Sequence, residues 1–385
     1  MVTLQSAENA LKSYYLGVVA DQLNTAINPL LSKIRQSTTD VWGKEVRKMA
    51  PYGVNGGISA GTEDGDLPTA ASNNYVQFVS GLKNLYGKIE ITDKALRASQ
   101  NNAGAFVNLL NAEMEGLIKA ASFNFGRMLF GDGSGKLCEV EFISGAGKIT
   151  YSTTRNVMEG QVVDFVRAGS VVASGYRITF VDRTNNEIAF DKTLTGVQEG
   201  DIMVLQGSYN NEITGLGAIF AGEGCIYGLN KADYSWLTPY TDESTNKIDD
   251  LALQALVDTL QERAGSEVDI MICSAGVRRA YIKEMMNYKR NVDTVELKGG
   301  YRAISFNGIP LVADRFCPGY SLYALDSKDF VFHQLCDWKW LEGEEGKILR
   351  QLPNKPVYTA TLVKYTELMC DRIYGQGRMI ALDEA

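Results

Sequence analysis

The sequence predicts an α+β protein whose main body is interrupted by a small β-rich domain. Three observations support this class. The sequence predicts one long amphipathic helix, a run of short alternating strands directly after it, and a C-terminal half in which helices and strands alternate. The order strand, long helix, β insert, helix, strand, helix, strands favours local strand pairing. With 385 residues the chain is long enough for two to three domains.

The strongest helical pattern runs over residues 102–130, directly before the glycine-rich stretch 131–135. Apolar side chains recur there in steps of three and four, so one face of the helix is buried. Asn101 or Asn102 can cap its start, and the glycines end it. A helix of this length measures roughly 42 Å. We expect it to support an extended plate through its buried residues Phe106, Leu110, Met114, Leu117 and Phe125.

The stretch 51–74 is the least regular part of the chain, with five glycines, two prolines and the acidic residues Glu63, Asp64 and Asp66. Strand-like segments flank it at 42–46 and 75–79. We therefore predict the tip of a long two-stranded arm. Such an arm is not stable alone, and we expect it to lie on another copy of the same protein. Before it, residues 4–35 have helical periodicity, interrupted by Pro29.

Residues 138–208 alternate with a period of two and carry frequent turn signals, which predicts a small β-barrel or sandwich inserted into the main fold. Farther on, residues 249–263 form a predicted helix with Leu251 among its buried residues. The apolar run 268–273 is typical of a central strand.

Ser274 is expected to cap a second helix, and Asn307-Gly308 predicts a type I′ hairpin. Two long strands, 357–369 and 372–382, are expected to close the chain.

The composition limits the possible functions. The net charge is −8, and no apolar run approaches the length of a membrane span, so neither tight nucleic-acid binding nor a membrane protein is indicated. The first residues lack the apolar core of a signal peptide, and we expect synthesis in the cytoplasm. The six cysteines form no CxxC pair and are expected to be buried and reduced. The single histidine, His333, is expected to make structural contacts in a strand.

No motif predicts an enzyme, a metal site or a cofactor. The run 131–136 resembles a phosphate-binding loop, but Phe130 replaces its first glycine and Leu137 replaces the Ser or Thr that would bind magnesium. It also follows a helix, whose C-terminus repels phosphate. The acidic residues at 63–66 match no calcium-binding loop and indicate a solvated turn.

Several stretches together resemble the major capsid proteins of tailed phages with the Hong Kong 97-type fold. The element order of the whole chain matches, and the detailed similarity is confined to about 41–135. The stretches that carry it are 40–45, 52–57, 61–68, 83–91, 94–99 and 123–133.

The resemblance implies a division of the chain into an N-terminal arm, an extended loop, a peripheral domain with the long spine helix, a β-rich insertion domain, a connection, an axial domain, and peripheral return strands. The corresponding ranges are 1–49, 50–92, 93–137, 138–210, 211–248, 249–345 and 346–385. The implied assembly residues of the extended loop are Gly56, Gly57, Asp64, Lys83, Tyr86 and Lys88. Those of the axial loop are Lys298, Gly299, Gly300 and Tyr301.

The implied function is a structural subunit, not an enzyme, that forms pentamers and hexamers in the icosahedral head of a tailed double-stranded DNA phage. Scaffolding and portal proteins, a possible decoration protein and packaged DNA bound without sequence specificity are the implied partners. Relatives often begin with a cleaved scaffold segment, which we do not expect here. Some cross-link a loop lysine to an asparagine, and for Lys83 and Lys88 we expect no such bond.

Two alternatives remain open from the residues. One is an encapsulin-like compartment that holds enzyme cargo. The other is a secreted β-rich binding module or hydrolase, against which the missing signal peptide and the unpaired cysteines argue.

Overall fold

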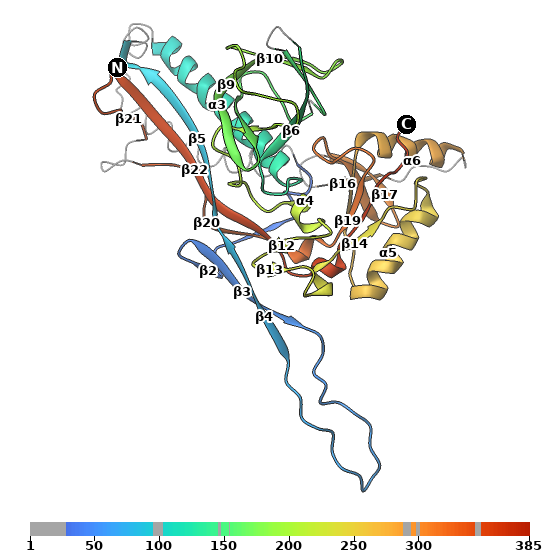
Figure 1. Ribbon diagram of the computed structural model, residues 1–385. Coiled ribbons are helices and arrows are strands. Elements are labelled where there is room, and N and C mark those ends of the chain that lie inside the picture. The colour runs from blue at the N-terminus through green and yellow to red at the C-terminus, as the bar shows by residue number, and fades with distance from the viewer. Residues whose placement is uncertain are drawn as a thin grey trace.

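The computed structural model describes residues 28–94, 103–144, 148–153, 155–287, 294–297, 301–342 and 348–385. The chain forms two open sheets with helices, one closed barrel and one projecting hairpin (Figure 1). The predicted N-terminal helical periodicity falls mainly on residues outside this description, as do Lys298, Gly299 and Gly300. Among the described helices, none is both long and apolar enough to cross a membrane.

The long helix α3 (Ala103–Met128) covers one side of a five-stranded sheet, as the sequence predicts. Strand β22 is paired along its length with β5 and β20. Phe125 of α3 lies with its ring centroid 5.4 Å from that of Phe332 and 6.1 Å from that of Trp338. The strands of this sheet are β1 (Arg35–Ser37), β5 (Lys83–Thr92), β20 (Phe330–Trp340), β21 (Arg350–Gln351) and β22 (Val357–Cys370).

A seven-stranded sheet forms the second body, with helices α5 (Asp250–Ala264) and α6 (Ala275–Asn287). Its central strand β15 is completely buried, which confirms the prediction for this apolar run. Its strands, in order across the sheet, are β14 (Tyr240–Asp242), β23 (Gly377–Met379), β19 (Leu322–Leu325), β15 (Ile270–Cys273), β18 (Ile309–Ala313), β17 (Tyr301–Phe306) and β16 (Thr294–Leu297).

The predicted caps and turn of this second body are present. The Asp249 carboxylate accepts a hydrogen bond from the Ala252 amide at 2.8 Å and caps α5. The Ser274 hydroxyl accepts one from Val277 and caps α6. Asn307 and Gly308 both have positive φ, 49° and 81°, as a two-residue hairpin of type I′ requires.

The residues after α3 form a closed six-stranded barrel (Figure 1). Phe165 lies in its centre, with no exposed surface, and contacts the rings of Tyr176 and Phe190 edge to face. In order around the barrel, the strands are β10 (Glu187–Phe190), β7 (Lys148–Tyr151), β6 (Lys136–Ser144), β11 (Ile202–Leu205), β8 (Val162–Arg167) and β9 (Ser170–Asp182).

The chain from barrel to second body contains four short elements. They are α4 (Leu216–Ile219), β12 (Cys225–Ile226), β13 (Leu229–Asn230) and the 3₁₀ turn η1 (Ser235–Leu237).

Three expectations about the C-terminal strand, α5 and the cysteines are wrong. The predicted strand 372–382 is instead the 3₁₀ turn η3 (Ile373–Gly375) followed by β23, because the chain turns here and joins the seven-stranded sheet. Leu251 is 80% exposed, since it occupies the solvent side of the first turn of α5. Cys225 is also exposed, on the short hairpin β12–β13, whereas Cys138, Cys273, Cys317 and Cys370 are buried thiols.

Candidate functional site

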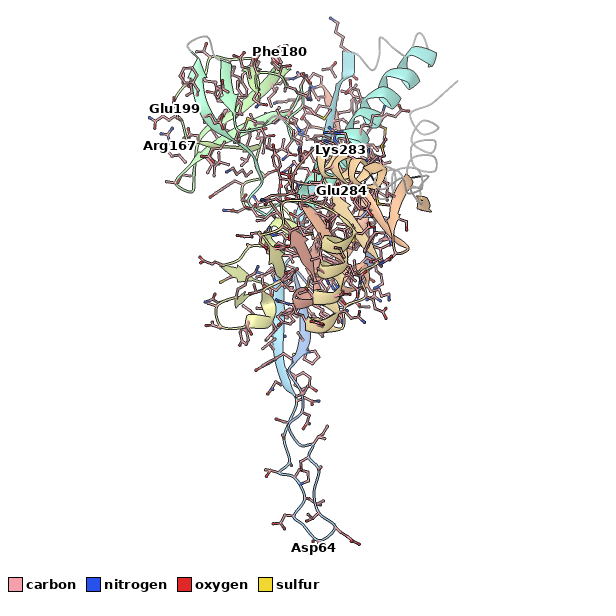
Figure 2. The ribbon with its side chains drawn as sticks, turned by 90° about the vertical axis from the view of Figure 1, so that its right-hand side faces the viewer. Asp64, Arg167, Phe180, Glu199, Lys283 and Glu284 are labelled. Atoms are coloured by element: carbon pink, nitrogen blue, oxygen red, sulfur yellow. The ribbon has the colours of Figure 1, made fainter. Side chains whose placement is uncertain are left out.

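A hairpin arm projects from the body of the molecule and ends in a long loop (Figure 1). Strands β3 (Glu45–Tyr52) and β4 (Asn74–Gly81) pair in register along their whole length, and β2 (Val41–Trp42) adds to β3. Figure 2 shows Asp64 at the far end of this arm and Phe180 of the barrel at the opposite end of the molecule. The arm predicted from the sequence is therefore present.

The tip of the arm, residues 53–73, combines exposed apolar side chains with negative charge. Val54 and Ile58 are each 86% exposed, and Leu67 is 90% exposed. The carboxylates of Glu63, Asp64 and Asp66 lie in the same loop, and the sequence has no lysine or arginine between residues 49 and 82. Fully burying one such aliphatic side chain stabilises a protein by about 1.5–3 kcal/mol. The tip therefore offers apolar contact area that its own chain does not cover.

The base of the arm is held by aromatic rings from a distant part of the sequence. Tyr52 stacks on Trp236 with 5.6 Å between ring centroids, and Phe78 lies 5.4 Å from Tyr227 and 6.0 Å from Trp236. The Val79 amide also donates a 2.9 Å hydrogen bond to the carbonyl of Tyr227. Such ring pairs contribute about 0.5–1.5 kcal/mol beyond their buried area, so the base has a fixed position.

An ion pair adds to this attachment. The Lys48 ammonium on β3 lies 2.5 Å from the Asp371 carboxylate at the end of β22. The Lys48 side chain is 26% exposed and that of Asp371 is 33% exposed. A partly desolvated pair of this kind is stronger than one on the open surface, because water screens it less. The arm is thus connected at its base to both the aromatic segment and the main sheet.

The predicted assembly residues divide between two places. Gly56, Gly57 and Asp64 lie in the arm tip, where the Gly57 amide donates to the Asn55 side chain at 2.9 Å. The other three, Lys83, Tyr86 and Lys88, were expected in the same loop, but the structure places them on β5, paired with β22. The reason is that the chain re-enters the sheet at residue 83, where continuous backbone pairing begins.

The three residues on β5 have partners within the chain. The Lys83 ammonium donates to the carbonyl of Asn210 at 3.2 Å. Tyr86 is 63% exposed and meets Tyr365 edge to face. The Lys88 ammonium lies 2.6 Å from the Glu90 carboxylate and thereby lowers the pKa of Glu90.

The spine-helix residues whose side chains are described support the sheet, as predicted. Met114 and Phe125 are each 1% exposed, and Leu117 is partly buried against the core. Leu117 lies directly over Gly87 of β5, where a Cβ atom would approach its Cδ1 to 3.0 Å. Phe106 and Leu110 lie within α3, and Tyr301 lies at the start of β17. The side chains of these three residues are not among those that the structure describes.

The stem that joins the barrel to the sheet contains buried charged groups. The Arg127 guanidinium of α3 lies 2.5 Å from the Glu212 carboxylate, and both side chains are 3% exposed. Glu367 on β22 is fully buried and accepts hydrogen bonds from the amides of Thr214 and Leu368 through one oxygen. Burial raises the pKa of Glu367 to about 7, although these amides and Lys83 favour the ionised form.

Beneath α3, the buried Lys364 ammonium lies 2.6 Å from the Asp337 carboxylate, and burial lowers the pKa of Lys364 while Asp337 opposes this shift. His333 is buried on β20 with Nδ1 3.0 Å from the carbonyl of Thr39, in agreement with its predicted structural contacts. Within the described ranges, no group of three or more histidine, cysteine or acidic side chains could hold a metal ion.

The aromatic attachment of the arm was not found from the sequence. Its signal was nevertheless visible, because the irregular stretch 227–240 contains four aromatic residues and only one glycine. Aromatic side chains in an irregular segment indicate a packed contact rather than a solvated loop. What the sequence did not indicate was that this contact would be the base of the arm.

Neither a protein-family profile nor a curated protein matches the sequence. Among solved structures, the capsid asymmetric unit of cyanophage A-1(L) aligns over 93% of this chain and 93% of its own, with a TM-score of 0.56 at 11% identity. The chain therefore shares the fold of that capsid protein, which confirms the predicted fold class.

Two further matches are more distant. The capsid of the native GTA particle aligns over 91% of this chain and 89% of its own, with a TM-score of 0.47 at 12% identity. The encapsulin complex from Synechococcus elongatus aligns over 95% of each chain, with a TM-score of 0.46 at 13% identity.

Proposed function

We propose that this protein is the major capsid protein of a tailed double-stranded DNA phage and assembles into an icosahedral head of the Hong Kong 97 type. The observation that carries the proposal is the arm, with its fixed base and uncovered apolar tip, on a chain with a capsid-protein fold. An arm of this kind is suited to contact a neighbouring copy. Repeated in every subunit, such contacts give an avidity that one contact lacks.

Several features support this assignment over a soluble binding protein. The tip of the arm, residues 53–73, has no second layer over it, and two-stranded hairpins are marginally stable in water. The long helix α3 and the five-stranded sheet form a stiff support from which the arm extends. A net charge of −8 suits a container for DNA, because a strongly basic lining would hold phosphates.

In this assignment the subunits form pentamers and hexamers, and the shell is completed with scaffolding and portal proteins and a possible decoration protein. The DNA inside is packed without sequence-specific contacts. The protein is made in the host bacterium and remains in the virion.

Negative-stain electron microscopy and analytical ultracentrifugation of the purified protein test the proposal. The matched variant removes residues 54–72 and joins Gly53 to Asn73 through Asn-Gly, a two-residue turn that suits antiparallel strands and keeps the register of β3 and β4. We expect closed shells from the wild type and a folded, unassembled chain from the variant. Equal shell yield from the two proteins would contradict the role of the arm, and wild-type monomers under all conditions would refute the shell function.

The contents of shells made together with the neighbouring genes decide between a phage head and an encapsulin-like compartment. Double-stranded DNA in nuclease-treated particles supports the phage head. Particles filled with one enzyme and free of DNA would instead establish the compartment.

A further inference from the structure

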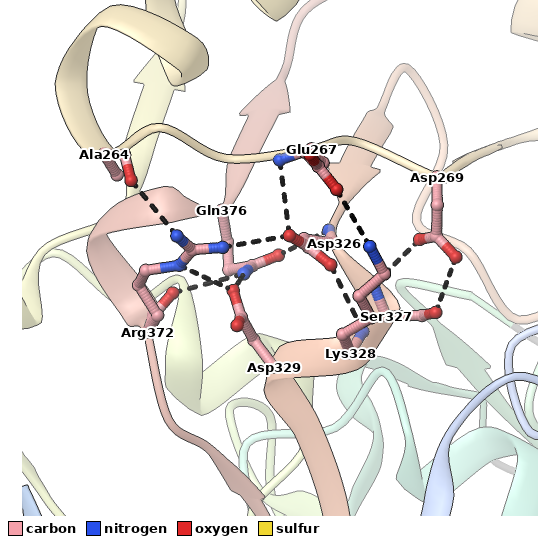
Figure 3. Close-up of polar contacts among 9 residues, drawn as sticks. All are labelled: Ala264, Glu267, Asp269, Asp326, Ser327, Lys328, Asp329, Arg372 and Gln376. Atoms are coloured by element: carbon pink, nitrogen blue, oxygen red, sulfur yellow. Dashed lines mark hydrogen bonds and ion pairs between the residues drawn. The ribbon is translucent and has the colours of Figure 1, made fainter.

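Two segments of the chain cross side by side between the five-stranded and seven-stranded sheets (Figure 3). The first crossing runs from β19 through the 3₁₀ turn η2 (Ser327–Asp329) into β20. The second runs from β22 through η3 into β23. The Asp371 amide of the second crossing donates a 2.9 Å hydrogen bond to the Asp329 carbonyl of the first. The relative orientation of the two sheets depends on how these turns are held together and on the apolar core that the sheets share, in which Phe123 of α3 lies 5.0 Å from Phe316, a residue between β18 and β19.

One arginine connects both crossings and a helix end. The Arg372 guanidinium donates from Nε to Asp329 at 3.0 Å and from a terminal nitrogen to Asp326 at 2.9 Å. Its other terminal nitrogen donates to the carbonyl of Ala264, the last residue of α5, at 3.1 Å. A planar guanidinium can satisfy three acceptors at fixed angles, which a lysine ammonium does less well.

Gln376 connects the same two turns a second time. Its amide nitrogen donates to the Asp329 carboxylate at 2.8 Å, and its amide oxygen accepts from the Asp326 backbone at 3.0 Å. Gln376 is completely buried, and the Asp326 side chain is 3% exposed. Buried polar groups that lose such partners are costly, so these turns have one strongly favoured arrangement.

The turn network continues to the arm. Asp371, which lies next to Arg372, pairs with Lys48 of β3 at 2.5 Å. On the other side, the Glu267 amide donates to Asp326, and Asp269 binds both the Ser327 hydroxyl at 2.7 Å and Lys33 at 3.1 Å. The contacts of the arm base and of the sheet junction are thus neighbours in one network.

We propose that Arg372 locks a hinge between the two sheets and that Lys48 couples the arm to this hinge. With the contacts of Arg372 intact, the two crossings move as one body and the arm keeps a fixed direction. Without them, the Gln376 contacts, the backbone bond from Asp371 to Asp329 and the shared apolar core remain, and the sheets can shift about the two 3₁₀ turns. In a shell this hinge would set the angle between neighbouring subunits; that part rests on the proposed function, whereas the hinge itself is a property of the single chain.

Amide hydrogen exchange of the full chain, read by mass spectrometry, tests the hinge. The diagnostic amides are those of Asp371 and Asp326, whose hydrogen bonds join one crossing to the other. We expect Arg372→Gln to speed their exchange by about tenfold or more, while amides within the β20–β22 pair change less than about twofold. Arg372→Lys keeps the charge but loses the three-acceptor geometry. Its exchange rates at these amides should lie between those of the wild type and those of Arg372→Gln.

Arg167→Gln is the matched control. Arg167 donates to Asp201 at 2.7 and 2.8 Å, and its side chain is 36% exposed, close to the 38% of Arg372. It lies in the barrel (Figure 2), so faster exchange should remain there. If Arg372→Gln speeds exchange equally in both sheets, or not at all, the hinge lock is refuted.

If Arg372→Gln does not fold, Arg372→Lys is judged by the same criterion. Lys48→Gln should speed exchange at the Asp371 amide by about two- to threefold. If exchange at that amide does not change, the coupling between Lys48 and the hinge is refuted. The hinge itself is then judged by the Arg372→Gln variant. A chain that passes the exchange test but forms no shells would refute the proposed function and not the hinge.

Discussion

The arm and the barrel are both built from antiparallel strands, yet they place their apolar side chains in opposite ways. In the barrel, Phe165, Ile149 and Met203 have no exposed surface, and the strands close on themselves without an edge. In the arm, Ile58 and Leu67 are almost fully exposed. The difference teaches that apolar surface serves folding where a second layer encloses it, and is available for association where no such layer exists.

The two regions also differ in how they are attached. The barrel joins the body through buried ionisable groups, Arg127 with Glu212 and the carboxyl of Glu367. The arm joins it through stacked rings, chiefly Trp236, and one ion pair from Lys48. The stability of the barrel attachment should therefore depend on pH, whereas the stability of the arm attachment should fall when aromatic contact area is removed.

The largest expected effect on folding comes from the barrel core. Phe165→Ala should lower the free energy of unfolding by about 3–5 kcal/mol, because it removes a fully buried ring and leaves a cavity. Phe180→Ala, at a ring that is 49% exposed on the same barrel, should cost less than about 1 kcal/mol. Urea denaturation of both variants measures this contrast, and equal losses would show that the barrel interior is not the source of its stability.

Next in size is a pH effect at the barrel stem. Glu367 has a folded pKa of about 7, above its ordinary value of 4.5, so the folded state binds the proton more tightly. Its contribution to stability is therefore complete below about pH 4.5 and lost as the pH rises through 7, and amounts to about 3 kcal/mol.

Glu367→Gln should remove this part of the pH profile, because the amide has no proton to lose. The difference between wild-type and variant free energies of unfolding, measured from pH 4.5 to 8, isolates it from all other titrating groups. Parallel profiles would mean that Glu367 does not titrate in this range.

A smaller effect is expected at the base of the arm. Trp236→Ala removes the ring contacts with Tyr52 and Phe78 and should cost about 1–2 kcal/mol. The Val79 amide, which bonds to Tyr227, should also exchange faster. Trp42→Ala is the control, since Trp42 is 69% exposed on β2. A cost that is the same for both tryptophans would argue against the aromatic attachment.

The smallest effect on folding should come from the arm tip. The double variant Ile58→Ser, Leu67→Ser should change the free energy of unfolding by less than about 0.5 kcal/mol, because neither side chain is covered in the chain itself. Shell yield should nevertheless fall strongly. The control Ile58→Leu, Leu67→Ile keeps the apolar area and should assemble, and normal shells from the serine variant would show that the tip makes no essential apolar contact.

The sequence by itself determined the local elements. Steps of three and four fixed α3, alternation of period two indicated the barrel strands, and Asp249, Ser274 and Asn307-Gly308 marked caps and a turn, because each depends on residues close together in the chain. The arm was also predictable, since glycine-rich residues between two strand patterns leave few other structures.

Only the tertiary structure decided which elements share a sheet. It assigned Lys83, Tyr86 and Lys88 to β5 rather than to the arm, and moved the last strand to the seven-stranded sheet. It also brought Trp236 to the base of the arm and Arg372 to both crossings. Such contacts join residues far apart in the chain, and their free energy depends on burial and geometry that no local pattern contains.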